Sequence, residues 1–247
     1  MRQVVLLVLV AACKKAGDDY PVLPPDMTID PTLVDAATHD GGGGDAAAID
    51  ALVGIAGRVC LYTDARAQQV CKPTGAGGLT VNVGGKTATT AADGSFTIGT
   101  PTGTNPVWHV SGAMITTSVM PFGSSNQIPA ILASDYLDLE GQNGASVQAL
   151  SDGEAFVRVV HAGAPLANAK GGSAPQSTYG PLYDAANALV WNSGANQGTG
   201  AAGMVWFPGI AAGTATLSVT PPGGSPIPIP NVPIEGQSIT YLLVDTP

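Results

Sequence analysis

The stretch from Leu79 to Ile98, LTVNVGGKTATTAADGSFTI, decides the fold class. Its apolar residues at 79, 81 and 83 alternate with polar ones, which is the two-residue period of a half-buried β-strand. Gly84-Gly85 marks a hairpin turn, and Asp93-Gly94 turns the chain again into a strand over 95–98. Short strands joined by tight turns at this spacing predict a β-sandwich.

The composition of the whole chain supports an all-β fold. The 247 residues include 33 Gly and 20 Pro, and only 11% are charged against 45% apolar, which excludes a helical bundle. Further strands are predicted at 53–62, 107–110 and 113–120. The formal net charge of -9 works against a surface that neutralises phosphates, so nucleic acid is not an expected partner.

Two short motifs in the first unit resemble a known family. Gly57-Arg58-Val59 and the run from Thr90 to Ile98 are similar to the Gly-x-Val and Thr-x-x-Asp-Gly-x-Phe motifs of carboxypeptidase regulatory-like domains. The resemblance implies a transthyretin-like (prealbumin-type) sandwich over residues 52–138, with Phe96 in its core. Such domains are accessory modules on many secreted proteins, so the resemblance implies no particular activity.

A second β-sandwich is predicted over residues 153–247, after a linker at 139–152. The run 199–209 echoes the Thr-turn-aromatic element of the first unit, although Ala202 stands where the turn aspartate would be. This echo suggests a diverged copy of the first unit. The prolines of Ile227-Pro228-Ile229-Pro230 withdraw ladder donors, so this run is expected at a sheet edge or in a polyproline-like connection.

The first twelve residues have the features of a signal peptide. A short basic start is followed by an apolar run that is too short to cross a bilayer as a helix. The run ends in Val10-Ala11-Ala12-Cys13, which resembles the lipobox of bacterial lipoproteins. The resemblance implies that Cys13 is lipidated and becomes the mature N-terminus, and that Lys14 after it favours the outer membrane. Two or three acyl chains would fasten the protein to a membrane.

Residues 13–51 are expected to form a disordered, acidic linker. The segment has no Lys or Arg between residues 18 and 50 and is rich in Gly, Ala and Pro, so it cannot bury enough apolar surface to fold. Its acids lack the spacing of calcium-binding loops. The aspartates are Asp18, Asp19, Asp26, Asp30, Asp35, Asp40, Asp45 and Asp50.

Cys60 and Cys71 are the remaining cysteines if Cys13 is acylated. An even number of cysteines in an oxidising compartment favours a disulfide between them, which would stabilise the fold by roughly 3 kcal/mol. Free or metal-bound thiols are the alternative, but no second Cys or His pair lies nearby to complete a zinc site.

Two groups of side chains are candidates for chemistry or binding. The carboxylates Asp135, Asp138 and Glu140 could act as an acid/base pair or bind calcium, although a solvated linker is the simpler interpretation. Aromatic residues of the second unit could form a platform for sugars or peptides, or they could fill its core. The aromatic candidates for ligand binding are Trp191, Trp206, Tyr179 and Tyr183.

The sequence thus predicts a lipid-anchored protein of the cell envelope, on the periplasmic face or the surface of the outer membrane. Its role would be that of a non-enzymatic binding or structural β-sandwich module, with no cofactor and no metal. The expected partners are the membrane, through the lipid, and an envelope protein or glycan. The alternatives are a carbohydrate- or peptide-directed hydrolase that uses the three carboxylates, and an adhesin that uses the aromatic platform.

Overall fold

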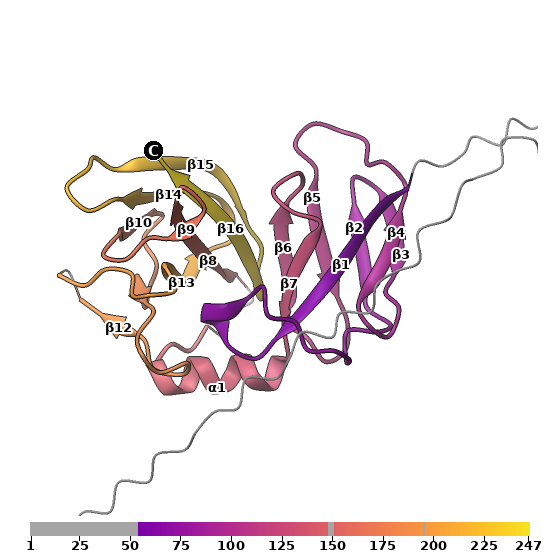
Figure 1. Ribbon diagram of the computed structural model, residues 1–247, viewed down its shortest axis with the longest axis horizontal. Helices are drawn as coiled ribbons and strands as arrows, with labels where there is room; N and C mark the ends of the chain where they lie inside the picture. The colour runs from indigo at the N-terminus through magenta and orange to yellow at the C-terminus, as the bar shows by residue number, and fades with distance from the viewer. Residues whose placement is uncertain (1–53, 148–150, 195) are drawn as a thin grey trace, which may run out of the picture. The chain divides into compact units, whose positions relative to one another are not determined.

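A computed structural model describes residues 54–147, 151–194 and 196–247 (Figure 1). These residues belong to one compact unit. The predicted signal peptide (1–12), the predicted lipidation site Cys13 and the predicted linker (13–51) all lie outside the described residues. Within the described part the protein is nearly all β, as predicted, with one α-helix.

The first half of the unit contains seven strands. β1, β4 and β7 form a three-stranded sheet in the order β4-β1-β7, and the other four are neighbours in a larger sheet in the order β6-β5-β2-β3. The strands predicted from the alternating stretch, β2, β3 and β4, are confirmed. The bounds are β1 (Ile55–Tyr62), β2 (Thr80–Val83), β3 (Lys86–Thr89), β4 (Ser95–Ile98), β5 (Val107–Ser111), β6 (Thr117–Pro121) and β7 (Gln127–Ile131), with a 3-10 turn η1 (Ala65–Ala67) after β1.

The described residues of the second half form nine strands. Three of them form a separate sheet in the order β10-β14-β15, so the proline-rich β15 is an edge strand, as predicted. The others belong to the larger sheet in the order β12-β11-β13-β8-β16, with β9 paired to β8. The bounds are β8 (Asp152–His161), β9 (Ala164–Pro165), β10 (Lys170–Ala174), β11 (Leu182–Tyr183), β12 (Asn192–Ser193), β13 (Met204–Ala211), β14 (Gly213–Thr220), β15 (Ile227–Ile234) and β16 (Ser238–Thr246).

The two halves repeat one pattern of strand pairing. β1 pairs antiparallel with β4 and parallel with β7, and β8 pairs antiparallel with β13 and parallel with β16. In each half the remaining principal strands form an antiparallel group, β2-β5-β6 in the first and β10-β14-β15 in the second. The second half therefore has the topology of a diverged copy of the first.

Equivalent threonine-to-glycine turns support this correspondence. Thr90 Oγ1 donates to Ala76 O at 2.5 Å, and Thr199 Oγ1 donates to Leu166 O at the same distance. Four residues further on, Gly94 and Gly203 both have positive φ, and their carbonyls accept from the N–H groups of β1 and β8 at 2.8 and 2.7 Å. A Cβ at either glycine would collide with a carbonyl oxygen of the neighbouring strand, so glycine is required there.

A carboxylate from elsewhere in the chain replaces the turn aspartate that the second copy lacks. In the first copy, Asp93 Oδ1 accepts from Ser95 N at 3.0 Å. In the second, Asp184 is buried and accepts from the N–H groups of Gly200, Ala202 and Met204, each at 2.8 Å. Three backbone donors compensate the burial of this charge.

The structure corrects the predicted separation of the two units. β16 pairs in parallel with β8 on one side and with β6 on the other, where Ile239 faces Ser118, so one continuous ten-stranded sheet extends through both halves. The β16 and β6 ribbons lie side by side at this junction in Figure 1. The residues between the halves are also not a simple linker, because α1 occupies Ala133–Asn143, across the predicted boundary at 139.

Two hydrophobic clusters form on opposite faces of the continuous sheet. β8 contributes Phe156 to one cluster and Val157 to the other, and both side chains are fully buried. In the first cluster the β4-β1-β7 sheet packs against the first half of the large sheet, and α1 adds Tyr136 and Leu139. In the second cluster the β10-β14-β15 sheet packs against β8 and β13. Each half is therefore a sandwich of two sheets, as predicted.

Candidate functional site

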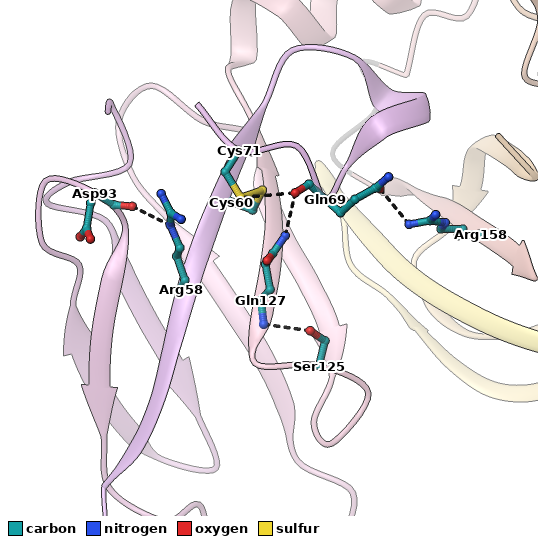
Figure 2. Close-up of a disulfide and its surroundings, with 8 residues drawn as sticks. All are labelled: Arg58, Cys60, Gln69, Cys71, Asp93, Ser125, Gln127 and Arg158. Carbon is teal, nitrogen blue, oxygen red and sulfur yellow. Dashed lines mark hydrogen bonds between the residues drawn. A yellow bond between two sulfur atoms is a disulfide. The ribbon is translucent and has the colours of Figure 1, made fainter. Parts of the chain in front are cut away.

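The disulfide predicted between Cys60 and Cys71 is present. The two Cα atoms lie 4.7 Å apart, and the bond links the buried Cys60 on β1 to the end of the loop that contains η1. Inside this loop Asp64 caps η1 by accepting from Arg66 N at 2.9 Å. Figure 2 shows the disulfide with the loop beside it.

The disulfide-closed loop contacts both halves of the protein through Gln69. Gln69 O accepts from Gln127 Nε2 on β7 at 3.2 Å, and Gln69 Oε1 accepts from Arg158 Nη1 on β8 at 2.8 Å (Figure 2). Ser125 Oγ in turn accepts from Gln127 N at 2.9 Å. The end of the loop is thus held both by the disulfide at Cys71 and by the hydrogen bonds of Gln69, two residues before it.

A cavity of about 250 Å³ lies against this loop, and we call it the disulfide-loop cavity. Its apolar lining comes from Met120, Pro129, Tyr241, Leu242 and Leu243, of which Leu243 is 56% exposed. Its polar lining consists of Gln68, Gln69, Ser124, Ser125, Gln127 and Arg158. Amides, hydroxyls and a guanidinium beside an apolar surface are typical of small-molecule sites.

Two side chains that line this cavity each contain an N–H donor without a partner among the described residues. Gln68 Nε2 and Arg158 Nε are both buried and make no hydrogen bond within the described part of the protein. Arg158 also forms no ion pair with any described carboxylate. Each of these two nitrogens exposes less than 1 Å² to solvent, so neither donor is open to the cavity, although the Arg158 side chain as a whole is only half-buried.

The guanidinium of the neighbouring Arg66, unlike that of Arg158, has several hydrogen-bond partners. It forms an ion pair with Asp64 at 2.7 Å and donates through Nη1 to the carbonyls of Ala185 and Ala186, each at 2.7 Å. Hydrogen bonding to Asp64 raises the pKa of Arg66, and the hydrogen bonds from Arg66 hold the pKa of Asp64 below its usual value despite the opposing effect of burial. Arg66 is therefore bound by acceptors from three residues, whereas Arg158 forms one hydrogen bond among the described residues, from Nη1 to Gln69.

A second cavity of about 500 Å³ contains buried acids. Glu154 on β8 is 2% exposed, and its Oε2 accepts from Trp206 Nε1 at 2.6 Å, while Oε1 has no partner among the described residues. Burial raises the pKa of Glu154 to about 8, against the opposing effect of the Trp206 hydrogen bond. Glu140 on α1 accepts from Val147 N at 2.9 Å, and burial raises its pKa as well.

The three carboxylates that the sequence nominated for hydrolysis do not come together. Asp135 forms an ion pair with Lys72 at 3.4 Å, and Asp138 is exposed on α1. Of the three, Glu140 alone lines the 500 Å³ cavity. The residues that join it there, Asp152 and Glu154, lie on β8 and were not predicted. No group of three His, Cys, Asp or Glu side chains in the described ranges is placed to hold a metal.

The predicted aromatic platform is wrong for three of its four members. Trp206 is fully buried, Trp191 is 5% exposed and Tyr183 is 3% exposed. Trp191 packs edge-on against Trp206 with ring centroids 5.7 Å apart, so both are core residues. Tyr179 is 39% exposed, and its hydroxyl donates to Ser146 O at 3.1 Å. The adhesin hypothesis that needed exposed tryptophans therefore fails.

Sequence reasoning missed the polar lining of the disulfide-loop cavity. Gln68, Gln127 and Arg158 are about 90 residues apart at the extremes and match no motif. The one available signal was the polar pair Gln68-Gln69 inside a loop closed by two cysteines.

No helix within the described segments combines the length and hydropathy needed to cross a membrane.

Comparisons with known proteins identify no family. No family model and no curated protein matches the chain. Among solved structures, the Bacillus anthracis TIE protein aligns with 78% of this chain at 13% identity and a TM-score of 0.24, and the chain spans 33% of that protein. The group B streptococcus pilus 2b backbone protein aligns over 70% of this chain and 79% of its own, at 15% identity and a TM-score of 0.23. TM-scores of this size do not establish a common fold.

Proposed function

We propose that this protein is a lipid-anchored envelope protein whose folded unit is a non-enzymatic binding module. Cys13 would carry the lipid, and the acidic linker would hold the module away from the membrane. The observation that supports binding is the disulfide-loop cavity, where the side chains of glutamines, serines and Arg158 lie beside apolar side chains. A cavity that combines an apolar surface with a few polar groups is typical of ligand sites.

The acids of the 500 Å³ cavity support a binding module over a hydrolase. Glu140 accepts from Val147 N at 2.9 Å, and Glu154 accepts from Trp206 Nε1 at 2.6 Å. Both acids thus accept hydrogen bonds from fixed donors of the fold, and the other two carboxylates nominated for hydrolysis, Asp135 and Asp138, lie outside this cavity. This arrangement supports a structural role for the two glutamates.

Metabolic labelling with a fatty-acid probe tests the anchor. The wild-type protein should be labelled and found in the membrane fraction, whereas Cys13→Ala should lose the label and leave the membranes. The matched control is the double variant Cys60→Ala/Cys71→Ala, which removes the disulfide cysteines but keeps Cys13 and should keep the label. Equal labelling of wild type and Cys13→Ala would overturn the lipid anchor.

A further inference from the structure

We propose that the prolines of β15 block this edge of the protein against pairing with a strand of a second copy of the chain. β15 is an outer strand of the β10-β14-β15 sheet (Figure 1). An outer strand offers its free N–H and C=O groups to any strand that meets it. Ile227 and Ile229, both half-buried, give β15 the β-branched apolar side chains that favour such pairing. This inference goes beyond the proposed function, because it concerns a surface outside the disulfide-loop cavity.

The register between β14 and β15 shows which backbone groups of β15 point outward. In an antiparallel ladder, residues that exchange hydrogen bonds with the partner strand alternate with residues whose N–H and C=O point away from it. Pro228 lies opposite Ser218, and the residues on either side of Pro228 also pair with β14. Pro233 lies opposite Thr214. Because proline has no N–H to exchange, these two pairs are the non-bonded ones, and the backbone of both prolines faces outward.

A side-chain contact at the end of β15 agrees with this direction. The carbonyl oxygen of Pro233 accepts from Thr240 Oγ1 of β16 at 2.6 Å, so it points away from β14. The same hydrogen bond occupies this carbonyl and covers the end of the strand that precedes β16. The open part of the edge is therefore the other end, where Pro228 and Pro230 are exposed.

Pro230 continues the outward series. It follows Ile229, which is in a bonded pair with Leu217, so Pro230 takes the next outward position. The register then shifts in a bulge that contains Asn231, whose φ is 59°. A bulge bends the strand and disrupts its pairing. The exposed part of the edge thus presents carbonyl acceptors at Pro228 and Pro230 but no N–H donor at either, and an incoming strand needs both to form a ladder.

The opposite edge of the same sheet is closed by another device. Because Val219 bonds to β15, its partner Gly171 on β10 is in a non-bonded pair, and the N–H of Gly171 points outward. This N–H donates to the hydroxyl of Tyr183 at 3.0 Å. A donor that is already bonded within the chain is not offered to another strand. The prolines therefore guard the edge at which no side chain of this kind covers the exposed end.

Light scattering coupled to size-exclusion chromatography tests the proposal over a micromolar to millimolar concentration series. The sample is the chain from residue 13 onward, with Cys13→Ala throughout so that no lipid drives association. Pro228→Thr/Pro230→Thr restores two outward N–H groups on a strand of high β-propensity. We expect the mass of one chain for the wild-type edge and at least twice that mass for the variant at high concentration. The matched control Pro221→Thr/Pro222→Thr changes two prolines before β15 and should keep the mass of one chain.

A lysine variant separates pairing at the edge from a general loss of stability. Pro228→Lys/Pro230→Lys removes the same prolines and restores the same N–H groups, but its like charges oppose pairing between two copies, so it should keep the mass of one chain. Hydrogen-exchange mass spectrometry then locates the contact. In the associated threonine variant, exchange over residues 227–230 should slow as concentration rises, while exchange over β3, at the far edge of the larger sheet, should not change.

Three results would overturn the proposal. The first is a folded threonine variant with the mass of one chain across the whole series. The second is a lysine variant that associates as strongly as the threonine variant. The third is a wild-type edge that already associates with slowed exchange over 227–230. If the double threonine variant does not fold, Pro228→Thr alone, at an exposed position, is measured in the same way and judged by the same results.

Discussion

Replacing Glu154 by Gln should remove most of the pH dependence of stability above pH 4.5. Glu154 has a pKa of about 8 in the folded protein, against an ordinary value of 4.5. Between these pH values the folded state binds a proton that the unfolded state has lost, so stability falls as pH rises. At 1.36 kcal/mol per pH unit the loss from pH 4.5 to pH 8 is roughly 5 kcal/mol. Below pH 4.5 this contribution is fully present, and above pH 8 none of it remains.

Urea unfolding followed by tryptophan fluorescence, from pH 4.5 to 9, measures this effect. Glu154→Gln keeps the size of the side chain and an oxygen that can accept from Trp206 Nε1, and it does not titrate. The free energy of unfolding of the wild type should therefore fall by several kcal/mol relative to Glu154→Gln across the range. Asp138→Asn, which changes an exposed acid on α1, is the control, and its free energy of unfolding should change with pH as that of the wild type does. If the free energy of unfolding of Glu154→Gln also changes with pH as that of the wild type does, the assignment of a buried, protonated Glu154 is wrong.

Three further changes test the architecture, each by the free energy of unfolding in urea. Cys60→Ala/Cys71→Ala should lower stability by about 2–4 kcal/mol, because the unfolded chain loses a short closed loop; a value near zero would show that the loop is not under this constraint. Gly94→Ala and Gly203→Ala should each destabilise by more than about 2 kcal/mol, since both combine positive φ with a collision of the new Cβ; a large cost at one position with none at the other would contradict the equivalence of the two turns. Asp184→Ala should cost about 2–5 kcal/mol by leaving one buried and two partly buried N–H groups without their acceptor, and a neutral effect would argue against its role in the second turn.

Local patterns in the sequence were sufficient to predict the strands of the first hairpins and the two equivalent turns. The alternation at 79–83 and the turns at Gly84 and Gly94 place β2, β3 and β4 within a residue or two. The Thr-to-Gly spacing at Thr199 survives in the second copy even though its aspartate is missing, because the threonine hydroxyl and the positive φ of the glycine are what the turn needs.

The features that sequence reasoning missed depend on contacts between distant residues. Parallel pairing of β16 with β6 joins positions more than 100 residues apart and leaves no local pattern. α1 lacks a starting signal, since Leu132 at its N-cap forms no side-chain hydrogen bond, and Gly141 interrupts its sequence. For these reasons the sequence did not predict that part of the linker is a helix.

The candidate site also depends on contacts between residues that are distant in the sequence. The tryptophans were correctly recognised as residues that could fill a core, but sequence alone left the exposed alternative open until burial was known. Arg158 lies within a strand that is otherwise buried, and its partner Gln69 comes from a loop 89 residues away. Only the fold brings these groups to one cavity.

Mass spectrometry of the N-terminal peptide of the protein, purified from membranes of its native host, tests the central claim most directly. A lipid-anchored binding module requires a mature chain that begins at Cys13 and carries a diacylglyceryl group on its sulfur. A peptide that begins at Met1, or an unmodified Cys13 in the membrane-derived protein, would contradict it.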